Sequence, residues 1–266
     1  MAAVEPLKRS VLASRRERKR VLRTQVATAL AMLLVWEGAG ASHLFYRGVL
    51  PSIFIIAAAL ARLLATPSFY TLHLATTAYE VLLAFAIGSL LGAAAGLVLG
   101  MFAYTGRVME PVVHYLAPTP KIVFLPVLLV MFGVGPGSKI ALGAISCFFP
   151  MALSVASGVR QVRPALLRVG RSLRLTPAQM LTKIYIPELL PPIASGLRLS
   201  LGISIVGCLL AELKLSNQGL GFLSLEYYRR FDIASMFAVV IVIFALAAVG
   251  NVAIGRLVRA PGPSKI

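Results

Sequence analysis

The chain has 266 residues, of which 59% are hydrophobic and only 13% are charged. Together with a mean hydropathy of +0.88, this composition excludes an ordinary soluble domain. The formal net charge of +17 would suit a nucleic-acid-binding protein. However, the basic residues gather in the N-terminal tail, one central segment and the C-terminal end, as the retention of positive charge on the cytoplasmic side of a membrane requires. Two cysteines in apolar runs indicate neither a disulfide framework nor a metal site. We therefore predict an all-α polytopic membrane protein without a metal or cofactor.

The N-terminal tail, residues 1–23, carries eight Lys and Arg residues against two Glu residues. It is too charged to fold alone, and we expect it to stay in the cytoplasm on anionic headgroups. The apolar run from about Thr24 to His43 is the first predicted transmembrane helix. Glu37 lies within this run and is costly there unless it faces other helices or water.

Two further helices are predicted before residue 105. Leu50 to Thr66 is a short apolar stretch, and we expect an external helix along the membrane interface, because a span here would place the basic central segment outside. A transmembrane helix is predicted from about Thr76 to Tyr104. Four glycines recur in it at four-residue steps on one face, which predicts close packing against a neighbouring helix: Gly88, Gly92, Gly96 and Gly100.

The next predicted helix, Val108 to Phe132, is interrupted by four prolines, of which Pro126 is the last. Broken helices leave backbone carbonyls unpaired, and this is tolerated beside a protein-lined or water-filled pathway but not in lipid. We therefore place this segment beside a translocation route. A turn follows, and then a helix from Lys139 to Val159 that should kink at Pro150.

The central segment, Arg160 to Pro187, is strongly basic and has a helical design of its own. Pro164 suits the first turn of a helix with apolar and basic residues on separate faces. Thr176 and Gln179 have the spacing of a capping box, which announces a second helix. That helix should stop near Ile186, because Pro187 disfavours helical geometry in the residue before it. The segment is either a helix-turn-helix elbow with apolar side chains free for a partner, or a charged loop that follows the positive-inside rule.

Two transmembrane helices complete the chain, Pro191 to Leu213 and Ile233 to Gly255. Glu212 and the polar residues after it, among them Ser216 and Asn217, either line or gate a pathway or form an ordinary polar loop. About six spans with both termini inside agree with the charge distribution.

A series of short motifs runs in a fixed order from about Val26 to Val258: Trp36-Glu37, Leu50-Pro51-Ser52, Phe124-Leu125-Pro126, Phe132-Gly133, Ser138-Lys139, Phe149-Pro150, Gly158-Val159-Arg160, Ile186-Pro187, Ala211-Glu212 and Gly219-Leu220-Gly221. In these motifs the chain resembles the permease subunit of binding-protein-dependent ABC importers, in the nitrate, sulfonate, taurine and bicarbonate branch. The resemblance implies the type I importer permease fold, the bacterial inner membrane and a non-catalytic subunit. It also implies three partners: ATPase subunits, a second permease subunit that is identical or homologous, and an extracytoplasmic substrate-binding protein.

In that family the elbow is the EAA loop, whose short helix sits in a groove on the ATPase. The resemblance assigns ATPase coupling to Arg168, Val169, Gly170, Arg171, Ser172, Leu173, Arg174, Thr176 and Pro187. Two positions depart from the family pattern, because Arg168 stands at the usual Glu and Arg174 at the usual Gly. Arg168 reverses the charge of any contact that the usual Glu makes with the ATPase. Arg174 removes the access to positive backbone angles that the usual Gly provides. Either the ATPase has complementary changes, or this chain is the degenerate half of a heterodimeric permease.

The resemblance also implies a pathway for a small solute, with Glu37, Pro126, Glu212, Ser216 and Asn217 as candidate lining residues. Arg62, Arg229 and Arg230 on predicted external loops favour an anion such as a sulfonate, nitrate or bicarbonate. The alternative is a membrane enzyme or an ATP-independent carrier that uses intramembrane carboxylates. The sequence lacks zinc-protease and nucleophile-elbow motifs and shows no inverted hydropathy repeat. The expected organisation is a cytoplasmic tail at 1–23, a permease domain at 24–259 with its coupling loop at 160–187, and a cytoplasmic tail at 260–266.

Overall fold

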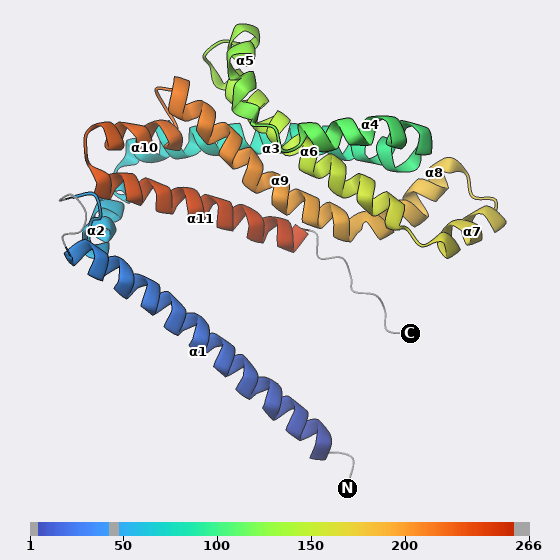
Figure 1. Ribbon diagram of the computed structural model, residues 1–266, viewed down its shortest axis with the longest axis horizontal. Helices are drawn as coiled ribbons and strands as arrows, with labels where there is room; N and C mark the ends of the chain where they lie inside the picture. The colour runs from blue at the N-terminus through green and yellow to red at the C-terminus, as the bar shows by residue number, and fades with distance from the viewer. Residues whose placement is uncertain (1–4, 43–47, 258–266) are drawn as a thin grey trace. The chain divides into compact units, whose positions relative to one another are not determined.

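The computed structural model describes residues 5–42 and 48–257, and every secondary-structure element in these ranges is helical (Figure 1). The chain divides into two compact units, residues 1–61 and 62–266. The expected C-terminal tail at 260–266 lies outside the described residues.

The first unit is dominated by α1, Glu5–Ala41, a continuous helix of 37 residues. The basic tail, which is predicted not to fold alone, is thus helical from Glu5 onward as part of a longer helix. The reason is that the tail is rich in Arg, Lys, Leu and Ala, which are strong helix formers, and that it extends an apolar helix. At the other end of α1, Glu37 Oε2 accepts a hydrogen bond from the Ile53 amide at 3.1 Å, and Trp36 Nε1 donates to the Pro51 carbonyl at 3.1 Å. Glu37 thus satisfies a free N–H group where α2, Ile53–Leu64, begins.

Three long helices form the centre of the second unit, with α6 packed between the other two (Figure 1): α3, Ala75–Met101, α6, Pro136–Gln161, and α9, Ile186–Leu215. A π-helical turn, Phe69–Leu74, leads into α3. Two more helices, α10, Leu220–Arg229, and α11, Ile233–Leu257, pack against α9 and against each other.

The glycine face of α3 lies against α6. At each of Gly88, Gly92, Gly96 and Gly100, an added Cβ atom would come within 3.0 Å of an α6 atom. The obstructing atoms include backbone carbonyl oxygens such as those of Phe148 and Ala152, which cannot rotate away. The two backbones therefore approach each other more closely than any larger residue in these positions would permit.

The segment between α3 and α6 is broken, as its prolines predict. It consists of α4, Ala103–Leu116, a 3₁₀ turn, Lys121–Phe124, and α5, Leu125–Phe132. The two arms, 103–116 and 121–132, are bent by 92° relative to each other.

Four helical stretches are long and apolar enough to cross a membrane: Phe69–Met101, Pro136–Gln161, Pro177–Leu215 and Ile233–Arg256. A fifth results if the bent pair counts as one span. With 12 residues α2 is too short to cross, as expected. The other predicted span, Thr24–His43, falls within α1 as far as Ala41 and stays a prediction, and His43 itself lies outside the described residues.

Candidate functional site

The elbow between α6 and α9 consists of α7, Pro164–Ser172, α8, Pro177–Met180, and a π-helical turn, Leu181–Tyr185. Its second helix begins with the predicted capping box. The Thr176 hydroxyl accepts from the Gln179 amide at 3.3 Å, and Gln179 Oε1 accepts from the Thr176 amide at 3.0 Å. Both bonds satisfy N–H groups that the first turn of a helix leaves free, so the short helix has a fixed start.

Arg174 ends α7 in a left-handed conformation, with φ of +51°. The amide of Leu175 donates to the Gly170 carbonyl at 3.0 Å and the amide of Arg174 donates to the Arg171 carbonyl at 2.9 Å, the two bonds of a Schellman motif. The expectation that arginine removes access to positive backbone angles is therefore wrong. The two hydrogen bonds hold an unfavourable conformation that glycine would adopt at no cost.

Gly170 lets α7 fold back onto the second half of the elbow. It is buried, and an added Cβ would come within 3.0 Å of the side chains of Met180 and Ile184. The neighbouring apolar side chains point outward, because Val169 is 55% and Leu173 is 67% exposed. The elbow therefore presents an apolar surface that nothing in the described chain covers.

Three exposed arginines flank this apolar surface: Arg168, Arg171 and Arg174. Within residues 5–42 and 48–257, none of the three forms an ion pair. Two other basic residues of the segment are paired, Arg160 with Glu110 of α4 at 2.5 Å and Arg163 with Glu188 of α9 at 2.9 Å. The unpaired charge thus gathers on the part of the elbow that also exposes Val169 and Leu173.

Pro187 does not end a helix, so the predicted stop near Ile186 is wrong. The path from Pro177 to Leu215 is one helical stretch of 39 residues. Pro187 lies in the first turn of α9, immediately after the π-helical turn. In the wider π-helical turn, the backbone carbonyl with which the proline ring would otherwise clash is displaced. In the first turn of a helix, a residue also needs no N–H donor. The second half of the elbow, from Pro177, is consequently continuous with α9.

A groove of about 710 Å³ lies between the break after α4 and the helices α6 and α9. The break contributes Pro120 and Lys121, α6 contributes Ser146 and Pro150 among others, and α9 contributes Gly207 and several aliphatic side chains. The lining is mostly apolar. The proline-broken segment thus borders a cavity, which agrees with the expectation that it lies beside a route through the membrane.

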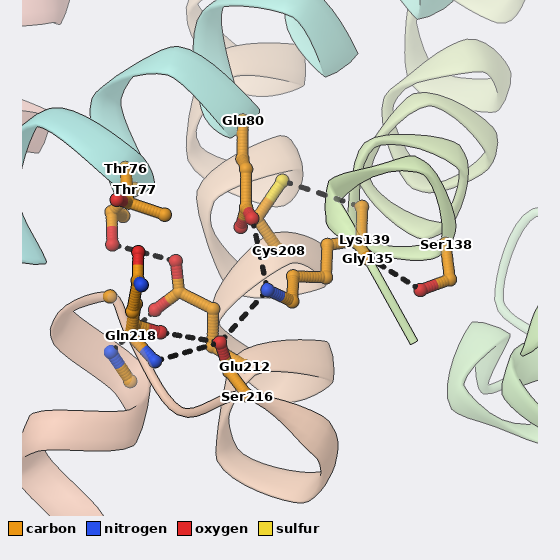
Figure 2. Close-up of polar contacts among 12 residues, drawn as sticks. Thr76, Thr77, Glu80, Gly135, Ser138, Lys139, Cys208, Glu212, Ser216 and Gln218 are labelled. Carbon is orange, nitrogen blue, oxygen red and sulfur yellow. Dashed lines mark hydrogen bonds and ion pairs between the residues drawn. The ribbon is translucent and has the colours of Figure 1, made fainter. Parts of the chain in front are cut away.

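Glu212 is fully buried and is held by two donors (Figure 2). Its Oε1 accepts from the Thr77 hydroxyl at 2.6 Å and its Oε2 accepts from the Gly221 amide at 2.6 Å. The Thr77 hydroxyl in turn accepts from the Leu220 amide at 2.8 Å. Gly219 has φ of +101° and lies so close that any side chain would collide with the carboxylate. The turn between α9 and α10 is therefore folded around this one carboxylate.

A second part of the same cluster joins α3, α6 and α9. Lys139 Nζ donates to Glu80 Oε1 at 3.1 Å and to Ser216 Oγ at 2.8 Å. Glu80 is fully buried and Lys139 is 5% exposed. A buried ion pair of this kind compensates charges that would be very costly alone within a membrane span.

The four residues of the second unit that are proposed for a pathway do not gather at one place, and Glu37 belongs to the first unit. Glu212 and Ser216 belong to the buried cluster, Glu37 bonds to the start of α2, and Pro126 and Asn217 are exposed. None of these five lines the groove.

Sequence reasoning missed Thr77, Lys121 and the pairing of Lys139. A signal for the last one was present, since a lysine inside an apolar helix requires a partner, and Glu80 is the acidic residue of the preceding span.

Comparison with known proteins identifies the chain's relatives. The taurine transport permease TauC of Escherichia coli is 33% identical over 151 residues, 57% of this chain and about half (55%) of that protein. The putative aliphatic sulfonates permease SsuC of Bacillus subtilis is 30% identical over 215 residues, 81% of this chain and 77% of that one. The nitrate import permease NrtB of Synechococcus elongatus is 29% identical over 177 residues, 65% of this chain and 63% of that one.

A solved structure has the same fold. An inward-facing MetNI methionine ABC transporter chain superimposes with a TM-score of 0.65 at 21% identity, covering 73% of this chain and 98% of that chain. The predicted type I permease fold is thereby confirmed. A model of the family described as the inner membrane component of binding-protein-dependent transport systems matches residues 84–263. This agrees with the predicted non-catalytic membrane subunit. With this match over more than half of its length, the chain belongs to the family of inner membrane components of binding-protein-dependent transport systems.

Proposed function

We propose that this chain is the permease subunit of an ATP-driven importer that carries a small anion inward. Two permease subunits form the pathway, and an ATPase acts on each through the elbow at 160–187. A soluble binding protein delivers the solute from outside. The permease domain extends over 24–259, and both tails, 1–23 and 260–266, lie in the cytoplasm.

The observation that carries this proposal is the elbow itself. Its first helix ends in a Schellman motif, its second helix starts with a capping box, and Val169 and Leu173 form an exposed apolar surface. Because Gly170 packs α7 against the second half of the elbow, and that half runs without interruption into α9, a force applied to α7 is transmitted to a helix that borders the groove. A charged loop that only obeyed the positive-inside rule would need none of these features.

The three unpaired arginines of the elbow indicate the chemistry of the ATPase surface. Arg168, Arg171 and Arg174 surround the exposed apolar side chains and would repel a basic groove. We therefore expect acidic residues around the docking groove of this chain's ATPase. A heterodimeric permease, in which the other subunit carries the more usual elbow, remains the second arrangement that fits.

The proposal that the solute carries an anionic group rests on the named functions of the relatives, which include taurine, aliphatic sulfonate and nitrate permeases. A bicarbonate permease of Synechococcus elongatus, 28% identical over 163 residues, points to the same class.

The test is affinity purification of the tagged chain in mild detergent, followed by identification of the co-purifying proteins. An ATPase subunit should appear with the native chain and be lost when Arg171 and Leu173 are both replaced by Asp. The matched control replaces Tyr228 and Arg229 by Asp, because this pair also combines an exposed large side chain with an exposed arginine. It lies on α10, at the opposite end of the second unit from α7 (Figure 1). Loss of the ATPase from both variants, or from neither, contradicts docking at the elbow.

A further inference from the structure

We propose that Lys121 is the residue in the groove that recognises the anionic group of the transported solute. This proposal rests on the proposed function, because it assigns the solute's charge to one side chain of the pathway. It commits to a small solute with an anionic group as the occupant of the groove.

The first argument is the charge of the groove lining. No Asp or Glu lines the groove, and Lys121 is the one Lys or Arg in its lining among the residues that the structure describes. His114 also contributes, but its side chain is 60% exposed and lies 3.5 Å from Glu110. A single positive charge in mostly apolar surroundings favours an anion and disfavours a cation, because the interaction is screened less there than in water.

The second argument concerns hydrogen-bond donors, which an anion needs. The lining hydroxyls of Ser146 and Ser154 donate their protons to the carbonyls of Leu142 at 2.6 Å and Pro192 at 2.7 Å. These two hydroxyls have no proton left for a solute. The third lining hydroxyl, on Ser157, accepts from Gln161 Nε2 at 2.9 Å and keeps an uncharged donor. The Lys121 ammonium has three N–H groups and uses two of them, on the carbonyls of Leu116, at 2.9 Å, and Ala117. One charged donor therefore remains.

The third argument is the way in which Lys121 is held. The two carbonyls belong to the C-terminal end of α4, and the ammonium also lies 4.9 Å from the centre of the Phe149 ring. A helix end carries only about half of an elementary negative charge. These contacts fix the position of the ammonium and offset its charge only in part, so that it can still make a charge-assisted hydrogen bond to an anion.

The same contacts have a simpler explanation, in which Lys121 only caps α4. Two substitutions separate the explanations. Lys121→Gln keeps an N–H donor for a carbonyl but removes the charge, whereas Lys121→Arg keeps both. The control is Arg107→Gln, which also removes a cation that donates to a backbone carbonyl of α4, here Ala103 at 3.3 Å, but lies outside the groove.

The experiment uses the complete complex with its own ATPase and binding protein in liposomes. Uptake is measured for labelled taurine, butanesulfonate, nitrate and bicarbonate, and for neutral formylaminopyrimidine, since a relative is a formylaminopyrimidine permease. The native complex should import at least one of the four solutes that carry an anionic group. Lys121→Gln should lower that uptake about tenfold or more, since a charge-assisted hydrogen bond is lost, while Lys121→Arg and Arg107→Gln retain most of it.

Unchanged anion uptake by Lys121→Gln overturns the proposal. Import of the neutral pyrimidine alone, or of none of these solutes by a complex with active ATPase, also counts against it. If the proposed function itself is wrong, the outcome differs, because no ATPase then co-purifies with the native chain. The apparent melting temperature of each variant is also measured. If Lys121→Gln and Lys121→Arg both lower the melting temperature and both lose uptake, only the capping explanation is supported.

Discussion

Thr77 and Glu212 are 135 positions apart in the sequence, yet the Thr77 hydroxyl donates to the Glu212 carboxylate at 2.6 Å, and neither side chain is exposed. The same hydroxyl accepts from the Leu220 amide. One small side chain on α3 therefore holds both the end of α9 and the start of α10.

Replacing Thr77 by Val should destabilise the protein, because it leaves the buried Leu220 amide and one carboxylate oxygen without a partner. The expected loss is about 1–3 kcal/mol, measured as a lower apparent melting temperature in detergent. Thr76→Val is the control, since the Thr76 hydroxyl bonds only to the Leu72 carbonyl of its own helical stretch at 3.0 Å. Equal shifts for the two variants would contradict the role of Thr77.

Replacing Lys139 by Met should be still more harmful, because the Glu80 charge then remains buried without compensation. Breaking a buried ion pair from one side costs about 3–5 kcal/mol. The double variant Lys139→Met with Glu80→Leu removes both charges and should recover much of that loss. A double variant that is less stable than Lys139→Met alone would show that the pair does not act as a unit.

Gly92→Ala tests the close approach of α3 and α6. The added methyl group meets the Phe148 carbonyl oxygen at 2.5 Å, so the helices must separate. Such overpacking costs about 1–3 kcal/mol. Gly202→Ala on α9 is the matched control, because an added Cβ there meets nothing within 4 Å, and alanine is the better helix former by roughly 1 kcal/mol. The two variants should thus shift the melting temperature in opposite directions.

Arg174→Gly should raise the stability of the elbow by up to about 1 kcal/mol, because glycine adopts the left-handed conformation without the steric cost that an L side chain bears. Arg171→Gly, inside α7, should lower the stability of the elbow by about 1 kcal/mol, because glycine is a poor helix former. Protection of the elbow amides in hydrogen exchange reports both effects. A lower protection in Arg174→Gly than in the native chain would mean that the guanidinium makes a stabilising contact.

The regular features of the fold could be predicted from local pattern. Hydropathy located the spans after residue 69, and the spacing of Thr176 and Gln179 located a helix start that both hydrogen bonds bear out. The glycines of α3 indicated a close neighbour but not that the neighbour is α6, because a pattern on one helix carries no information about its partner.

Two predictions are wrong because backbone context overrides a local preference. Pro187 is predicted to stop a helix, but the preceding π-helical turn accommodates it. Arg174 is predicted to avoid a positive φ, but two backbone hydrogen bonds impose one. The pathway role of Glu212 stays a prediction, and the donors of its carboxylate, on Thr77 and Gly221, could not be predicted because they come together only when the helices pack.

The most direct test of the central claim is ATP-driven uptake by the native complex in liposomes, compared with the complex that carries Asp at both Arg171 and Leu173. With binding protein outside and ATP inside, the native complex should accumulate an anion against its gradient. The elbow variant should not accumulate it, although its chain remains folded and inserted. Uptake that is independent of ATP, or equal in the two complexes, would contradict the account.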